Sequence, residues 1–146
     1  MTFVCGPAAS DAEVAECFEI MRQLRPGLDR ADWLPRVRRM QREGYRLATA
    51  RDADGVAAVA GYRMYDSIVR GGLSCYVDDL VTDERRRSRG AGHALLDWLV
   101  SEARRQRCTQ LCLDSGVQRP DAHRFYFRER MGITAFHFVL ALEQSP

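Results

Sequence analysis

The feature that most constrains how this chain folds is a strand pattern that changes phase over residues 73–82. Apolar residues lie two apart as far as Val77, then Asp78-Asp79 intervenes, and the apolar pair Leu80-Val81 no longer fits the alternation. Because the side chains of a regular strand alternate between the two faces of its sheet, such a change indicates an extra residue in the strand. The pattern therefore predicts a β-bulge close to the two aspartates.

An arginine- and glycine-rich turn, Arg87-Ser88-Arg89-Gly90-Ala91-Gly92, follows this strand and opens a helix predicted over residues 90–105. The first N–H groups of a helix have no acceptor within it, and the helix dipole adds roughly half a positive charge at that end. Glycines let the backbone approach phosphate oxygens, and Arg86, Arg87 and Arg89 add positive charge. The turn therefore favours a bound pyrophosphate, with a tight connection bearing solvated arginines as the alternative.

A dinucleotide-binding Rossmann unit is a weaker interpretation of the same turn. Asp114 ends the next predicted strand, where an acid could accept a hydrogen bond from a ribose 2′-hydroxyl. However, the third glycine of that fingerprint is missing, since Leu95 follows Gly90 and Gly92 at the relevant spacing. The turn also comes after a hairpin rather than in the first βα unit, and too little chain follows for further βαβ units.

The remaining patterns predict a sheet flanked by helices. Ser10 and Glu13 form a capping box that opens an amphipathic helix ending before Pro26-Gly27, and Asp54-Gly55 is a strong hairpin signal. The other predicted elements are a helix over 33–43, strands over 45–50, 56–65 and 109–113, a helix over 120–130, and a long final strand over 133–142. We expect one domain over residues 1–146, an α/β fold of the α+β type with a mixed, mostly antiparallel central sheet, a bulged central strand and a parallel crossover.

Composition and charge exclude several classes of protein. Of the 146 residues, 46% are hydrophobic, as in globular proteins. No apolar run approaches the ~20 residues of a membrane span, and the first ten residues lack a signal-peptide pattern, so we expect a cytoplasmic protein without a membrane partner. The formal net charge of +2 argues against a general nucleic-acid binder. The five cysteines are scattered singly, so we expect thiols rather than a metal site or disulfides.

Several segments, in the right order and over nearly the whole chain, resemble the GNAT superfamily of N-acetyltransferases. They are Tyr76–Glu84, similar to the family's bulged central strand; Arg87–Gly92, which fits its [Q/R]-x-x-G-x-[G/A] pyrophosphate loop; Ala122–Tyr126, which fits its later A-x-x-F-Y helix; and Ile133–Phe138, similar to its closing strand. Each motif is weak alone, and the combination is specific.

The resemblance implies a GNAT-like fold that transfers an acetyl group from acetyl-CoA, as cosubstrate, to a primary amine. Backbone amides around Leu80, Val81 and Thr82 would bind the pantetheine arm and the thioester oxygen. The pyrophosphate would be bound by Arg87, Ser88, Arg89, Gly90, Ala91, Gly92 and His93. Tyr126 would protonate the departing CoA sulfur, a general-acid role typically contributing ~10²–10⁴-fold. Packing in the core is the alternative role for Tyr126.

The base and the acceptor site are less sharply defined. Asp78 and Asp79 point to opposite faces unless the bulge intervenes, and Asp78 is the preferred base because it shares a face with Tyr76. Ordering of the strand end is the alternative role for either aspartate. Arg25 and Asp79 are candidates for binding the acceptor, a small molecule or a peptide, and the family often forms homodimers.

Two positions depart from the family pattern. Arg119-Pro120-Asp121 stands where an asparagine often contacts the pantetheine arm, so Asp114 or Ser115 would substitute for it. Arg130 stands where a glycine usually follows the late helix. Because glycine avoids the cost of a left-handed conformation, either that helix runs one turn longer or Arg130 is strained.

Two further functional hypotheses stay open beside the enzyme. A catalytically idle acyl-CoA-binding or sensor domain would share the phosphate loop without requiring Tyr126. A nucleic-acid-binding module would use Arg85 to Arg89, but no aromatic residues are interleaved there to stack on bases.

Overall fold

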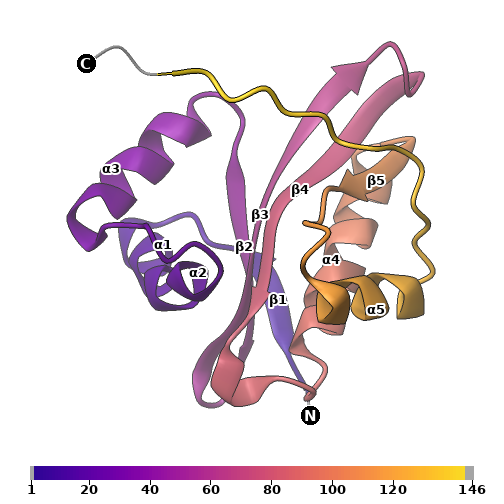
Figure 1. Ribbon diagram of the computed structural model, residues 1–146. Helices are drawn as coiled ribbons and strands as arrows, with labels where there is room; N and C mark the ends of the chain where they lie inside the picture. Colours follow the sequence, from indigo (N-terminus) through magenta and orange to yellow (C-terminus); the bar gives the residue numbers. More distant parts are fainter. Residues whose placement is uncertain (1, 144–146) are drawn as a thin grey trace. The chain divides into compact units, whose positions relative to one another are not determined.

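The computed structural model of the chain describes residues 2–143 and divides into two compact units between Leu113 and Asp114. The first unit contains β1 (Val4–Pro7), α1 (Asp11–Glu16), α2 (Phe18–Leu24), α3 (Arg30–Gln41), β2 (Arg46–Asp52), β3 (Gly55–Ser67), β4 (Gly72–Thr82), the 3-10 turn η1 (Glu84–Arg86), α4 (Ala91–Arg105) and β5 (Gln110–Leu113) (Figure 1). The second unit contains α5 (Pro120–Arg128). The expectation of one domain over 1–146 stays a prediction.

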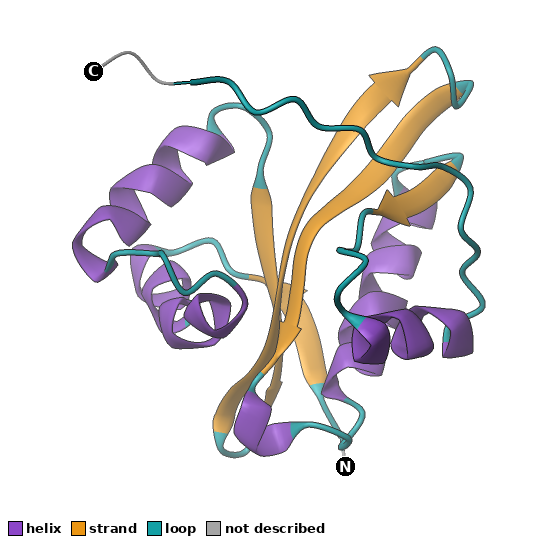
Figure 2. Ribbon diagram, in the orientation of Figure 1, coloured by secondary structure: helices purple, strands orange, loops and turns teal. Residues whose placement is uncertain are grey.

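The strands of the first unit form one sheet in the order β1-β2-β3-β4-β5 (Figure 2). All neighbours are antiparallel except β4 and β5, which are parallel and connected through α4. This arrangement confirms the predicted mixed, mostly antiparallel sheet with a parallel crossover. The strand β1 was not predicted, because its four residues, Val4-Cys5-Gly6-Pro7, carry no alternating pattern.

Helices cover both faces of this sheet, with α1, α2 and α3 on one side and α4 on the other (Figure 1). Successive residues of β2 pack into different cores: Leu47 joins Phe18 and Trp33 on the side of α1–α3, while Ala48 joins Leu95 on the side of α4. This is the period-two alternation of a strand buried on both faces. Within residues 2–143, no helix has both the length and the apolar character needed to cross a membrane.

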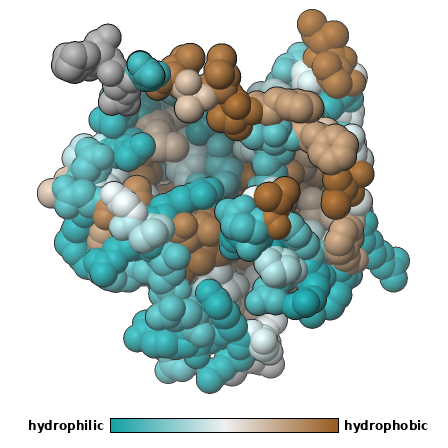
Figure 3. All heavy atoms as spheres, viewed as in Figure 1, coloured by the Kyte–Doolittle hydropathy of each residue, from teal (hydrophilic) through white to brown (hydrophobic). Residues whose placement is uncertain are grey.

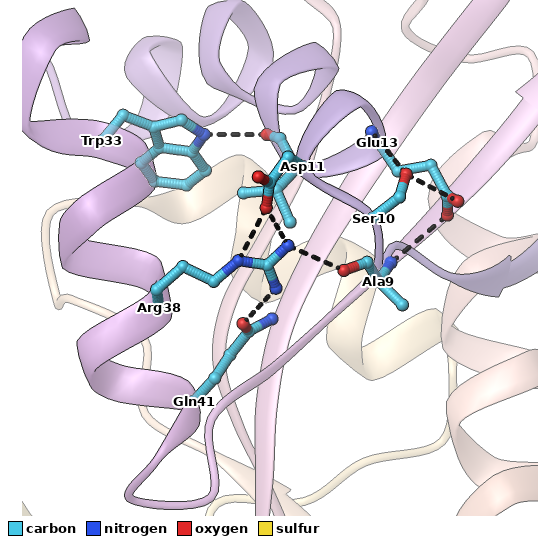
Figure 4. Close-up of polar contacts among 8 residues, drawn as sticks. Ala9, Ser10, Asp11, Glu13, Trp33, Arg38 and Gln41 are labelled. Carbon is cyan, nitrogen blue, oxygen red and sulfur yellow. Dashed lines mark hydrogen bonds and ion pairs between the residues drawn. The ribbon is translucent and has the colours of Figure 1, made fainter.

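The predicted residues Ser10 and Glu13 cap the start of α1, with the Glu13 carboxylate bonded one residue before the N-cap (Figure 4). The Ser10 hydroxyl accepts a hydrogen bond from the Glu13 N–H at 3.2 Å, and the Glu13 carboxylate accepts one from the Ala9 N–H at 3.2 Å. Two donors that the helix cannot satisfy are thereby paired. The indole N–H of Trp33 donates to the Val14 carbonyl at 2.8 Å, which ties α3 to α1. The predicted single helix is interrupted at Cys17, whose N–H donates back to Val14 at 3.1 Å in a tighter turn.

The predicted final strand over residues 133–142 is wrong for this structure. Residues 131–143 form no strand, and Phe138 of this segment is 91% exposed. Apolar residues are visible on the surface of the molecule (Figure 3). Alternation of apolar residues shows only that a segment suits a pleated, half-buried surface. A strand also needs a neighbour for its N–H and C=O groups, and the sequence of the segment does not specify that neighbour.

Arg130 takes the strained alternative that the sequence left open. The helix α5 ends at Arg128 instead of continuing, and Arg130 has a φ of +64°, in the left-handed region. The Arg130 N–H donates to the Phe127 carbonyl at 3.0 Å, and the next N–H, of Met131, donates to the Tyr126 carbonyl at 3.0 Å. Arg130 therefore closes the helix in the position where glycine is most favourable.

We predict that Arg130→Gly stabilises the protein. Relief of the left-handed strain, roughly 1–2 kcal/mol, exceeds the extra entropy of glycine in the unfolded chain, about 0.5–1 kcal/mol. The free energy of unfolding, measured by urea denaturation, should rise by about 0.5–1 kcal/mol. Arg128→Gly is the matched control, because Arg128 is a helical residue of α5 and the same substitution there should destabilise the protein. A loss of stability in Arg130→Gly would contradict the strain.

Candidate functional site

The predicted bulge lies at Asp78, in the middle of β4. Gly61 of β3 pairs with Asp79 and Tyr62 pairs with Val77, so Asp78 has no partner residue on β3. Packing confirms the change of phase, because Val77 packs on the side of α4 whereas Val81 packs on the side of α1–α3. An even separation would place both on one face in a regular strand.

One edge of β4 is open beyond the bulge. β4 pairs with β3 from Gly72 to Thr82, but β5 pairs with it only from Ser74 to Val77. Among the described residues, no strand covers this edge over 78–82, so it presents main-chain N–H and C=O groups without ladder partners. These are the residues in which the sequence places the amides for a pantetheine arm, Leu80, Val81 and Thr82.

The phosphate loop leads from this open edge into α4. Ser88 and Gly90 both have left-handed backbones, with φ of +63° and +91°, and Gly90 is the N-cap residue of α4. The first intrahelical bond runs from the Ala94 N–H to the Gly90 carbonyl at 2.9 Å, so the amides of Ala91 and Gly92 lie before the helical ladder begins. The first turn holds no acidic residue that would oppose an anion.

The arginines around this loop divide into two groups, which corrects the expectation that Arg86 adds charge for an anion. Arg86 is 12% exposed and forms an ion pair with Asp52, which is 8% exposed, and it donates to the Val56 carbonyl at 3.0 Å. Its charge is therefore neutralised by the β2–β3 hairpin. Arg85 pairs with Asp83 at 3.1 Å. Arg87 and Arg89 are exposed and remain as cations for a ligand.

Asp83 holds the start of the loop in place. Its carboxylate accepts hydrogen bonds from the Gln23 amide at 3.2 Å and from the Arg85 N–H at 3.2 Å, and its own N–H donates to the Ala57 carbonyl at 2.9 Å. Burial alone would raise the pKa of Asp83, but the hydrogen bonds from Arg85 and Gln23 lower it overall. Asp83 is therefore an anion with a structural role, and its contacts hold the turn η1 against α2 and β3.

The bulge brings both aspartates of β4 into one group of side chains, which we call the carboxylate cluster: Arg25, Tyr45, Arg63, Asp78 and Asp79. Asp79 accepts from the Arg25 guanidinium at 3.0 Å and from the Tyr45 hydroxyl at 2.9 Å. Asp78 accepts from Arg63 at 3.0 Å, and that guanidinium lies 5.4 Å from the centre of the Tyr45 ring. Arg25 and Asp79, predicted together as acceptor residues, are in direct contact.

The two aspartates of the cluster differ in their surroundings. Burial raises the pKa of Asp78 above its ordinary value, and the single partner Arg63 lowers it only in part. Burial also raises the pKa of the Tyr45 phenol, and the neighbouring Asp79 charge raises it further. Tyr45 therefore stays protonated and donates to Asp79. No sequence pattern predicts a role for Tyr45 or Arg63, because only the β2–β3–β4 pairing brings them beside the aspartates.

A glycine makes room for this cluster. A Cβ atom at Gly61 would overlap the hydroxyl of Tyr45 and come within 2.5 Å of its Cζ atom. The phenol ring therefore lies directly over the backbone of β3, opposite Asp79 in the register. Next to the cluster, a cavity of about 280 Å³ is lined by residues of α2, α3 and the loop between them, together with Tyr45 and Asp79.

The remaining predicted residues, Tyr126 and Ser115, belong to the second unit. Tyr126 lies on α5 with its ring centre 5.4 Å from that of Phe125, and burial raises the pKa of its phenol, partly offset by Arg119. The Ser115 hydroxyl is buried and has no hydrogen-bond partner among residues 2–143. No group of three or more His, Cys, Asp or Glu side chains in the described chain is arranged to hold a metal ion.

Comparison with known proteins decides the family. Residues 12–133 match the model of the acetyltransferase (GNAT) family. The chain belongs to the GNAT family of acetyltransferases. It is 38% identical over 126 residues to the uncharacterized N-acetyltransferase YhdJ of Bacillus subtilis (strain 168), a match that covers 86% of this chain and 87% of that protein. GNAT members use acetyl-CoA as cosubstrate, and this chain is an acetyl-CoA-dependent N-acyltransferase.

Two further proteins are similar to this chain, one in sequence and one in structure. An aminoalkylphosphonate N-acetyltransferase of Salmonella typhimurium (strain LT2) is 36% identical over 66 residues, 45% of this chain and 43% of that protein. The crystal structure of a ribosomal-protein-alanine N-acetyltransferase from Brucella melitensis biovar Abortus 2308 has a TM-score of 0.83 at 14% identity, covering 97% of this chain and all of that one. The second match shows a shared fold.

We predict that the ion pair between Arg86 and Asp52 is needed for stability. Arg86→Met leaves the Asp52 carboxylate buried without its cation, so the free energy of unfolding in urea should fall by about 3 kcal/mol. Arg87→Met, which removes an exposed arginine of the same segment, should have a much smaller effect. The double variant Asp52→Leu/Arg86→Met should recover most of the loss. Equal effects of the two single variants would contradict a structural role of Arg86.

Proposed function

We propose that the protein transfers the acetyl group of acetyl-CoA to a primary amine of its acceptor by direct attack. The observation that carries this proposal is the continuity of the open β4 edge at residues 78–82 with the left-handed loop and the start of α4. An open strand edge suits the amide-rich pantetheine arm, and a helix start suits a pyrophosphate.

The proposed donor site uses the residues predicted from the sequence. Amides of Leu80, Val81 and Thr82 bind the pantetheine arm and polarise the thioester carbonyl, and the Ser115 hydroxyl contacts the arm. The pyrophosphate is bound by Arg87, Ser88, Arg89, Gly90, Ala91, Gly92 and His93. The exposed cations Arg87 and Arg89 support this assignment, because Arg85 and Arg86 already have carboxylate partners.

In the proposed reaction, the acceptor nitrogen attacks the thioester carbonyl carbon, the carbon–sulfur bond breaks, and CoA leaves as a thiol. Asp78 takes a proton from the attacking amine, directly or through water, and Tyr126 gives one to the departing sulfur. The raised pKa of Asp78 makes it a stronger base than an ordinary aspartate. The raised pKa of Tyr126 keeps its phenol protonated at neutral pH, as a general acid requires.

The acceptor is a small molecule or a peptide with a primary amine, bound at Arg25 and Asp79. The relative from Salmonella typhimurium is named for an aminoalkylphosphonate, a small amine that carries an anionic group. A cytoplasmic location and a homodimer, without nucleic-acid or membrane partners, complete the proposal.

We predict that the protein binds acetyl-CoA through Arg87 and Arg89. In calorimetric titrations, Arg87→Gln and Arg89→Gln should each weaken acetyl-CoA binding about tenfold, because each removes a charge-assisted hydrogen bond to phosphate. Arg104→Gln, at the other end of α4, is the matched control and should leave the affinity unchanged. A protein that fails to bind acetyl-CoA would rule out both the transferase and an acyl-CoA sensor.

We predict that Tyr126→Phe impairs acetyl transfer without impairing the binding of acetyl-CoA. The turnover number, followed by release of free CoA, should fall about 100-fold or more, while the dissociation constant for acetyl-CoA stays unchanged. We expect the rate of the native protein to fall at alkaline pH, where the phenol deprotonates, and this fall to be absent in the variant. Tyr62→Phe removes a phenol hydroxyl from the core on the α4 side and serves as the control. An unaltered turnover number in Tyr126→Phe would remove the general-acid assignment.

A further inference from the structure

We propose that the acceptor is a small primary amine with an apolar body and an anionic group, bound in the cavity beside Asp79. This inference rests on the proposed acetyl transfer. The cavity has a volume of about 280 Å³, just below the roughly 300–1,000 Å³ of typical small-molecule sites. It therefore suits a molecule of amino-acid size rather than an extended peptide.

The greater part of the cavity wall is apolar. Its apolar side chains are Met21, Leu28, Trp33, Val37 and Met40. The indole N–H of Trp33 is already bonded to the Val14 carbonyl at 2.8 Å, so this ring offers no polar group to a ligand. A polar body in such a space would lose its hydrogen bonds to water without replacement, whereas an aliphatic or aromatic body gains by burial.

The polar groups of the cavity leave positive charge available. Asp79 is engaged on one oxygen by Arg25 and on the other by Tyr45. Arg36 forms an ion pair with Asp32 at 3.9 Å, beyond hydrogen-bond distance, and its side chain is 52% exposed. Two arginines thus share the lining with one carboxylate, and Arg36 keeps the planar fork of donors that matches a carboxylate or a phosphonate.

The direction of the acceptor follows from the same contacts. Asp79 and Tyr45 line the cavity at the bulge of β4, next to the edge at which the thioester is proposed to bind. An amine at this end would lie beside the Asp79 carboxylate, with its apolar body against Met40 and its anionic group toward Arg36. Arg36 is then a specificity-determining residue rather than a catalytic one.

Matched acceptors test both parts of the proposal. L-leucine has all three features, leucinamide lacks the anion as a peptide N-terminus does, and glycine lacks the apolar body. The kcat/KM for leucine, from CoA release, should exceed both others by about tenfold or more. Equal values for leucine and leucinamide would overturn the requirement for an anionic group. Equal values for leucine and glycine would overturn the requirement for an apolar body. The phosphonate analogue of leucine should also exceed leucinamide, and the better of the two acids identifies the anion.

Binding measurements separate this inference from the proposed function. Leucine is titrated calorimetrically into the protein alone, in parallel with acetyl-CoA. If acetyl-CoA binds but leucine neither binds nor reacts, the acceptor class is overturned and the donor site stands. If leucine binds but acetyl-CoA does not, the cavity assignment stands and the transferase proposal fails.

Variants of α3 test Arg36 directly. Arg36→Gln should raise the KM for leucine about tenfold, leave the rate with leucinamide unchanged, and so remove the preference between them. Arg36→Lys should restore part of that preference, because it keeps the charge but not the planar fork. Arg39→Gln changes an exposed arginine of the same helix outside the cavity and should leave the native preference intact. A preference for leucine that persists in Arg36→Gln would overturn the role of Arg36.

Discussion

The site depends on one irregularity of the backbone, the extra residue that Asp78 inserts into β4. In a regular strand Asp78 and Asp79 would point to opposite faces, and Val77 would pack on the same side as Val81. The bulge changes the phase between Val77 and Asp79, so that both carboxylates reach the carboxylate cluster. Beyond the bulge, β4 no longer pairs with β5, and the strand keeps main-chain groups available along one edge. The grouping of the two carboxylates and the open main-chain edge of β4 therefore both arise from the bulge at Asp78.

The arginines around the phosphate loop form two groups, since Arg85 and Arg86 have carboxylate partners whereas Arg87 and Arg89 are exposed. Asp52 and Asp83 neutralise Arg86 and Arg85, and they do so from the β2–β3 hairpin and the end of β4, which fixes the turn η1 before the loop begins. A loop that relied on all its arginines for an anion would repel itself when no anion is bound, because like charges would crowd one turn. Pairing the first two leaves Arg87 and Arg89 on a backbone already held in its left-handed form at Ser88 and Gly90.

Local sequence patterns predicted the local features of this fold, whereas contacts between residues distant in the sequence could not be predicted. The capping box at Ser10, the Asp54-Gly55 hairpin and the bulge each depend on neighbours in the sequence, and each is present. The partner of Arg86, Asp52, lies in the β2–β3 hairpin, and Tyr45 meets Asp79 only across β3. No local sequence pattern predicts either contact. The segment 133–142 shows the converse, a strong strand pattern without a strand, because pairing requires a neighbour that its own sequence does not specify.

The different surroundings of two adjacent aspartates argue for different roles. Asp79 accepts from a guanidinium and from a phenol, and two donors that stabilise its charge suit an anion with a fixed structural and binding role. Asp78 has one cationic partner, and burial raises its pKa, so it takes up a proton more readily than an ordinary aspartate. This difference supports Asp78, rather than Asp79, as the proposed base, with Arg63 holding its carboxylate at 3.0 Å.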